Sequence, residues 1–162
     1  MRQAVIVRPG EIKLGEARTP MPGSGQVRIR IQRIGVCGSD IHVYRGEHPF
    51  VKYPLVQGHE YAGFIDVIGE NVEGFKVGDK VTATPQEVCG DCAPCCRGQY
   101  NACEDLRVRG FQAPGCAQDH FVTEVEKLIR LPSEFKPEEG AFVEPIAVAA
   151  HSTARAGDLT GK

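Results

Sequence analysis

The sequence predicts a mainly β domain with short helices, folded as a barrel or a sandwich. The first two thirds of the chain contain many short apolar runs of strand length, separated by turn residues such as Gly, Asn and Asp. One run alternates most clearly, with Val27, Ile29 and Ile31 on one face and Arg28 and Arg30 on the other. Short strands at regular turn spacing are typical of closed or two-layered antiparallel sheets.

The predicted strands lie at residues 4–7, 12–14, 26–31, 61–68, 80–84, 121–125 and 128–131. Turns rich in Gly, such as Pro9-Gly10, separate them. The tail differs, because residues 137–156 are rich in Ala and Glu. Pro145 suits the first turn of a helix that runs to about Arg155, and Gly157 is expected to end it.

The composition of the 162 residues predicts a globular domain with one core. With 19 basic and 21 acidic side chains, the chain has no charge excess that would favour nucleic acid or an anionic membrane as a partner. No apolar stretch approaches the roughly 20 residues that span a bilayer, and the first residues do not form a signal peptide. Seven cysteines without an export signal predict a cytoplasmic protein that binds metal rather than one held by disulfides.

One short segment, CGDCAPCCRGQYNAC, contains Cys89, Cys92, Cys95 and Cys103. Four thiols at this spacing can converge on one tetrahedral zinc ion, a closed and therefore structural type of site. Cys96 directly follows Cys95, so we expect its side chain to point away from the metal. A metal-free loop and an iron–sulfur cluster are the alternatives. Bacterial ferredoxin motifs, however, place three residues before the fourth Cys, whereas seven stand there in this chain.

A second group of possible ligands is spread over three segments, GVCGSDIHVY, GHEYAG and VEPIAVAAH. Cys37, His59 and Glu60 offer soft, borderline and hard ligand atoms, which suit an open zinc site whose fourth position takes water or substrate. Each residue alone is weak evidence, because a single Cys is more often a small buried side chain. Ser39 and Asp40 have an alternative role as caps of a short helix.

These motifs, in this order, resemble the zinc-dependent medium-chain alcohol dehydrogenase family over essentially the whole chain. Gly58, His59, Glu60 and Gly63 match the family signature GHExxG, and the cysteine segment matches the family's structural-zinc lobe. The resemblance implies a GroES-like β-barrel catalytic domain at residues 1–156 with a zinc lobe at about 86–105. It also implies that residues 157–162 begin a linker to a Rossmann domain, before which the chain is truncated.

The resemblance also implies the roles of individual residues. Cys37 and His59 match catalytic zinc ligands, and Glu60 matches a residue that ligates directly or exchanges with water. Glu144 matches the acidic position of the sorbitol, iditol and threonine dehydrogenase branch, where classical alcohol dehydrogenases place a cysteine ligand, so the resemblance implies that Glu144 is a further ligand of the catalytic zinc. Asp40 matches the carboxylate that orients the ligand histidine.

The implied reaction is oxidation of a secondary alcohol of a polyol, sugar acid or related substrate to a ketone. Ser39 and His42 match a proton relay from the substrate hydroxyl to solvent. The implied cofactors are two zinc ions per chain and, in the full-length protein, NAD or NADP as hydride acceptor. No GxGxxG occurs in the chain, so the fragment alone is expected to be inactive.

The full-length protein is expected to be a homodimer or homotetramer, as in the family. One departure concerns the substrate, because Val43 stands where sorbitol dehydrogenases carry an aromatic residue. The main alternative function is a non-catalytic zinc-binding structural or interaction module. In that module only the four-cysteine segment would bind metal, and the upstream Cys and His would be core residues. Metal at Cys37 and His59 therefore discriminates between the two functions.

Overall fold

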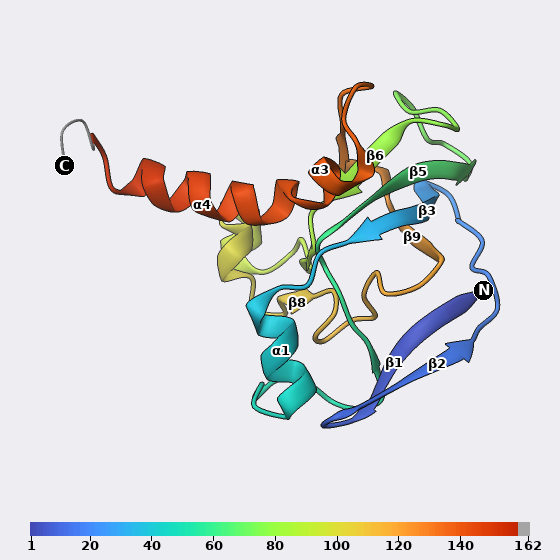
Figure 1. Cartoon of the computed structure of the whole chain (residues 1–162). Helices are drawn as coiled ribbons and strands as arrows, with labels where there is room; N and C mark the ends of the chain where they lie inside the picture. The colour runs from blue at the N-terminus through green and yellow to red at the C-terminus, as the bar shows by residue number, and fades with distance from the viewer. Residues whose placement is uncertain (159–162) are drawn as a thin grey trace.

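The structure of the chain is a computed structural model that describes residues 1–158. It is built mainly from short antiparallel strands (Figure 1). The strands are β1 (Arg2–Arg8), β2 (Glu11–Glu16), β3 (Gln26–Ile34), β4 (Leu55–Val56), β5 (Tyr61–Ile68), β6 (Lys80–Ala83), β7 (Gln86–Glu87), β8 (Arg107–Val108), β9 (His120–Glu124) and β10 (Leu128–Arg130). The helices are α1 (Gly38–Arg45), α2 (Ala93–Cys96), α3 (Pro137–Ala141) and α4 (Val143–Arg155), with short 3-10 helices at Tyr100–Ala102 and Val125–Lys127.

The strands form three antiparallel sheets. The largest has the order β10-β6-β5-β3-β9, and a second has the order β2-β1-β4. The third sheet is the pair β7-β8. Its two strands flank the segment that contains Cys89, Cys92, Cys95 and Cys103. Each predicted strand coincides with an observed one to within a few residues, so the prediction of a mainly β domain with short helices is confirmed.

The main core lies against the five-stranded sheet. The alternation predicted for β3 is observed, because Val27 and Ile29 are fully buried and Ile31 packs against the same cluster. Ile65 of β5 and Val81 of β6 complete the centre of this core. The alternating strand therefore presents its apolar face to the core, as period-2 patterning requires.

The end of β3 and the start of β5 lie side by side. The two strands pair antiparallel, and their last paired residues at this end are Ile34 and Tyr61. The chain after Ile34 leads to Cys37, whereas the chain before Tyr61 contains His59 and Glu60. This register brings ligand candidates 22 positions apart in the sequence to one edge of the sheet.

The tail forms two helices. The predicted helix is observed as α4, with Pro145 in its first turn and Arg155 as its last residue, and Gly157 follows in a left-handed conformation with φ of 74°. The separate helix α3, with Pro137 as its first residue, was not predicted. Figure 1 shows α4 extending away from the sheets. Of the predicted linker at 157–162, residues 159–162 lie outside the described part of the chain.

Candidate metal centres

The four cysteines at 89, 92, 95 and 103 converge as the sequence predicts. Their sulfur atoms all lie within 4.8 Å of one another, and the Cys89 and Cys95 sulfurs are 4.0 Å apart. Zinc–sulfur bonds of about 2.3 Å in a tetrahedron separate neighbouring sulfurs by about 3.8 Å. The donor set and its spacing therefore fit one zinc ion. Cys96 is exposed and outside this group, as expected.

Local backbone structure supports the thiolate form of one of these ligands. Backbone N–H groups of Glu104 and then Cys95 lower the pKa of the Cys92 thiol to about 7. Burial, in contrast, raises the pKa of Cys95. Metal binding requires thiolates, so the lowered pKa of Cys92 favours the ligand form of that side chain and the raised pKa of Cys95 opposes it.

The second predicted group, Cys37, His59 and Glu60, also converges, and it is called the open site below. Ligand atoms of Cys37, His59 and Glu60 all lie within 4.8 Å of one another. Cys37 caps the N-terminus of α1, while His59 and Glu60 lie between β4 and β5. Gly58 precedes them with φ of 96°, a left-handed conformation that favours glycine and turns the chain into this segment.

Asp40 fixes the surroundings of this group. One oxygen of its buried carboxylate accepts a hydrogen bond from the backbone N–H of Cys37 at 2.9 Å, and the other accepts one from Gln57 Nε2 at 2.9 Å. The latter oxygen also lies 3.7 Å from His59 Nδ1. Asp40 thus caps α1 and faces the candidate ligand histidine, which combines the two roles considered from the sequence.

The burial and hydrogen bonding of Glu60 and His59 indicate whether a cation fits between these side chains and Cys37. Their exposed fractions are 7% and 6%. Within the described residues, the Glu60 carboxylate receives no hydrogen bond, and His59 Nδ1 is buried without a hydrogen-bond partner. The Glu60 oxygens are not among the fully buried atoms without a partner, so they keep some contact with solvent, and a nearby cation would compensate their charge without displacing a protein donor. A thiol, an imidazole and such a carboxylate fit a zinc ion.

Glu144 lies near this group without belonging to it. It is half-buried in the first turn of α4 and is not among the atoms within 4.8 Å of one another. Burial raises the pKa of Glu144, His59 opposes the rise, and Glu60 adds to it. The structure thus brings together three of the four predicted ligands of the open site and leaves the fourth beside them.

The two residues of the predicted proton relay share one face of α1. Ser39 and His42 are three positions apart on the helix, a spacing that places side chains on the same side. Ser39 is half-buried, whereas the His42 side chain is 61% exposed. Glu47 lies 2.7 Å from His42 Nδ1. The arrangement leads from the ligand loop to solvent, with a carboxylate that orients the outer histidine.

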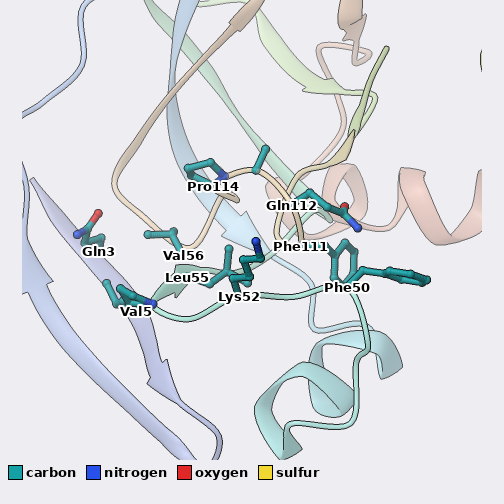
Figure 2. A pocket seen from close by; sticks show the side chains of 11 residues that line it. Gln3, Val5, Phe50, Lys52, Leu55, Val56, Phe111, Gln112 and Pro114 are labelled. Carbon is teal, nitrogen blue, oxygen red and sulfur yellow. The ribbon is translucent and has the colours of Figure 1, made fainter. Parts of the chain in front are cut away.

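An aromatic stack connects the open site with a surface pocket. The ring of Phe111 lies 5.1 Å from that of His59 and is stacked on that of His48 at 4.8 Å. Phe111 also lines a pocket of about 550 Å³ (Figure 2). Other lining residues come from β1, from residues 50–56 and from residues 112–114. Phe111 therefore supports His59 on the side that faces this pocket.

Three residues of the site were not found from the sequence. They are Gln57, which holds Asp40, Glu47, which contacts His42, and Phe111, which packs on His59. None of them belongs to a motif with a chemical meaning. Gln57 and Phe111 contact their partners through tertiary packing. Glu47 is only five positions after His42, so its negative charge gave a weak indication that the two side chains could meet.

A β domain with one four-thiol site and one mixed-ligand site is characteristic of zinc-dependent dehydrogenases. The description "Alcohol dehydrogenase GroES-like domain" belongs to the protein family that matches residues 23–133. The chain therefore belongs to the alcohol dehydrogenase GroES-like domain family.

Individual relatives agree with this assignment. The chain is 39% identical over 155 residues to a sorbitol dehydrogenase of Halalkalibacterium halodurans, covering 93% of this chain and 45% of the relative. It is 33% identical over 163 residues to an L-galactonate-5-dehydrogenase of Escherichia coli K12, covering 100% of this chain and 47% of the relative. The chain thus spans about half the length of the curated relatives it matches.

A solved structure extends the likeness to three dimensions. The crystal structure of a short chain alcohol dehydrogenase (rspB) from Escherichia coli CFT073, complexed with NADH, matches with a TM-score of 0.87 at 36% identity. The match covers 96% of this chain and 45% of that chain. Among the described residues, no helix has both the length and the apolar character that crossing a membrane requires.

Proposed function

We propose that this chain forms the zinc-binding catalytic part of an NAD(P)-dependent dehydrogenase that oxidises a secondary alcohol to a ketone. The observation that carries the proposal is the convergence of Cys37, His59 and Glu60 at one edge of the sheet. A non-catalytic module needs metal only at its four cysteines and gives no reason for a thiol, an imidazole and a carboxylate without a protein donor to converge elsewhere.

In this proposal the chain binds two zinc ions. The four thiols of the cysteine segment hold the structural ion. Cys37, His59 and Glu60 hold the second, with Glu144 nearby to complete the site or contact substrate. A zinc ion in the second site supplies Lewis acidity toward a substrate hydroxyl, which lowers the free energy of its deprotonation.

The residues of the chain then position the substrate and move its proton. As Ser39 accepts the hydroxyl proton, it releases its own proton toward His42, which passes a proton to solvent from the exposed end of the relay. Glu47, 2.7 Å from His42 Nδ1, orients the ring. Asp40 and Phe111 keep the His59 ring in place from two sides.

The proposed substrates are polyols, sugar acids and related compounds with neighbouring hydroxyls. Two named relatives, a sorbitol dehydrogenase and an L-galactonate-5-dehydrogenase, support this class. The site supports it too, because Glu60 and the half-buried Glu144 offer two acidic side chains near the reacting position. A hydroxyl beside the reacting one can donate a hydrogen bond to such a carboxylate.

The test is the zinc content of three proteins: the wild-type chain, Cys37→Ala and the matched control Cys96→Ala. Cys96 is a free, exposed cysteine outside both groups. We expect two zinc ions per wild-type chain, one in Cys37→Ala and two in Cys96→Ala. If Cys37→Ala retains as much zinc as the wild type, the open site does not bind metal and the proposal is wrong.

The reaction itself is tested with the full-length protein, by NADH formation from sorbitol and from L-galactonate. Cys37→Ala should abolish it while Cys96→Ala preserves it. We also propose that the full-length protein is a homodimer or homotetramer in the cytoplasm. Sedimentation equilibrium of the full-length protein tests the oligomer, and a monomer would contradict it.

A further inference from the structure

Gly35 and Glu60 are neighbours across the paired strands β3 and β5. They follow the last pair of the register, Ile34 and Tyr61, and the backbone N–H of Gly35 donates a hydrogen bond to the Glu60 carbonyl at 2.8 Å. Side chains at such opposed positions point to the same face of the sheet. The side chain of Glu60 therefore occupies the face on which residue 35 has none.

The Glu60 carboxylate uses the space of this missing side chain. A Cβ atom on Gly35 would lie 2.1 Å from Glu60 Oε2 and 2.9 Å from Glu60 Cβ. No carbon and oxygen atoms that are not bonded approach so closely. Because the backbone of Glu60 is tied to Gly35 by the hydrogen bond, its carboxylate would have to rotate away, and the contact between the two Cβ atoms would in addition push the two segments slightly apart.

Backbone conformation does not explain this glycine. Gly35 is not among the glycines with positive φ, so an alanine fits its backbone. Gly38, on the other side of Cys37, also has no positive φ, and a Cβ atom there would meet nothing within 4 Å. Gly35 and Gly38 thus lie on either side of Cys37 in the sequence. Only at Gly35 would an added side chain collide with a neighbouring side chain, that of Glu60.

We propose that Gly35 is a positioning residue, which keeps the Glu60 carboxylate within ligand distance of the Cys37 thiol and the His59 imidazole. The inference rests on the metal centre proposed above. A methyl group at position 35 would move the carboxylate out of the group.

The experiment is a Co²⁺ titration of the chain, with Zn²⁺ first bound to the four cysteines. The intensity of the cobalt d–d absorption reports the number and geometry of the ligands, independently of enzyme activity. We expect Gly35→Ala to weaken Co²⁺ binding by about 10- to 100-fold, the range seen when a group that orients a ligand is lost, and to change the d–d absorption. Gly38→Ala should bind Co²⁺ as the wild type does. Equal affinity and equal spectra for Gly35→Ala and the wild type would overturn the inference.

A second pair of variants separates an effect of residue 35 on the Glu60 side chain from an effect on the backbone. In Glu60→Gly, which has neither the carboxylate nor the Cβ atom that a methyl group at position 35 would meet, adding Gly35→Ala should weaken Co²⁺ binding less than threefold further, because effects on one interaction are not additive. A full 10-fold further loss would mean that residue 35 acts through the backbone, and it would overturn the inference. If Gly35→Ala alone fails to fold, recovery of the fold in the double variant supports a clash with the Glu60 side chain, and no recovery contradicts it.

Failure of the metal centre gives a different result. If the zinc-loaded wild-type chain binds no Co²⁺, the proposed open site is wrong and the role of Gly35 falls with it. If the zinc-loaded wild type binds one Co²⁺ ion and Gly35→Ala binds it equally well, only the role of Gly35 is refuted.

Discussion

Asp40→Asn should destabilise the fold and weaken the open metal site, although the two side chains have nearly the same shape. Each oxygen of the buried carboxylate accepts a 2.9 Å hydrogen bond, one from the Cys37 N–H and one from Gln57 Nε2. Asn has a single oxygen, so its amide group must face one of these donors. A buried donor without an acceptor costs about 1–3 kcal/mol, and the remaining bond loses its charge assistance, about 1 kcal/mol more. We therefore expect a loss of about 2–4 kcal/mol.

Urea unfolding of the zinc-loaded chain measures this loss, and Co²⁺ titration measures the open site. We expect the metal affinity of Asp40→Asn to fall by about 10- to 100-fold, because the carboxylate that faces His59 is lost. Asp119→Asn is the matched control: its partner Arg2 has an 83% exposed side chain, so the same substitution should cost less than about 1 kcal/mol. If Asp40→Asn unfolds within 0.5 kcal/mol of the wild type, roughly the scatter of surface substitutions, and binds Co²⁺ equally well, the reasoning is refuted.

Three further predictions concern the core, an ion pair and the cysteine segment. Ile65→Ala should lower the free energy of unfolding by about 2–5 kcal/mol in urea, since Ile65 is 1% exposed; a loss below 1 kcal/mol would contradict its place in the core. Burial opposes the ionisation of Asp79, but the Lys76 N–H and the Arg130 guanidinium hold its pKa below 3.8. The stabilisation by the charged form is thus complete above pH 3.8 and lost as the pH falls through the lowered pKa of the folded state. Asp79→Asn should therefore destabilise by about 1–3 kcal/mol at pH 7, with a difference from the wild type that shrinks below pH 3.8; a difference independent of pH would count against the ion pair. Cys103→Ser should remove the zinc of the cysteine segment and leave Co²⁺ binding at the open site, whereas loss of both ions would show that the two sites are coupled.

The parts of the fold that depend on local patterning were predictable. The alternation along β3 identifies its buried face without knowledge of its neighbours, and the Pro at 145 with the Gly at 157 places both ends of α4. The two-residue strands β4, β7 and β8 were missed, because such strands exist only through the partner with which they pair. Helix α3 was missed because five residues are too few for a helical period to stand out from the polar tail.

The same distinction applies to the two metal centres. The four cysteines fall within 15 consecutive positions, so their spacing alone predicts that they can converge. In the open site Cys37 lies 22 positions before His59, and no local pattern relates them. Their ligand chemistry and the resemblance to a family grouped them, and the register of β3 and β5 then gave the physical reason for their proximity. Gln57 and Phe111 carried no signal at all, since an amide and a phenyl ring acquire their roles only from the groups they contact.

The two centres also differ in what holds their ligands in place. The cysteine segment closes on the two-residue strands β7 and β8, and its helix α2 spans four residues, so the metal itself must supply much of its order. The ligand candidates of the open site follow directly from long paired strands and are fixed by the Asp40 carboxylate and the Phe111 ring. A site prepared in this way keeps its geometry when a ligand is exchanged for water or substrate, as a catalytic ion requires. Gly35 fits this design, because it gives one of those ligands, the Glu60 carboxylate, a defined place without contributing a side chain of its own.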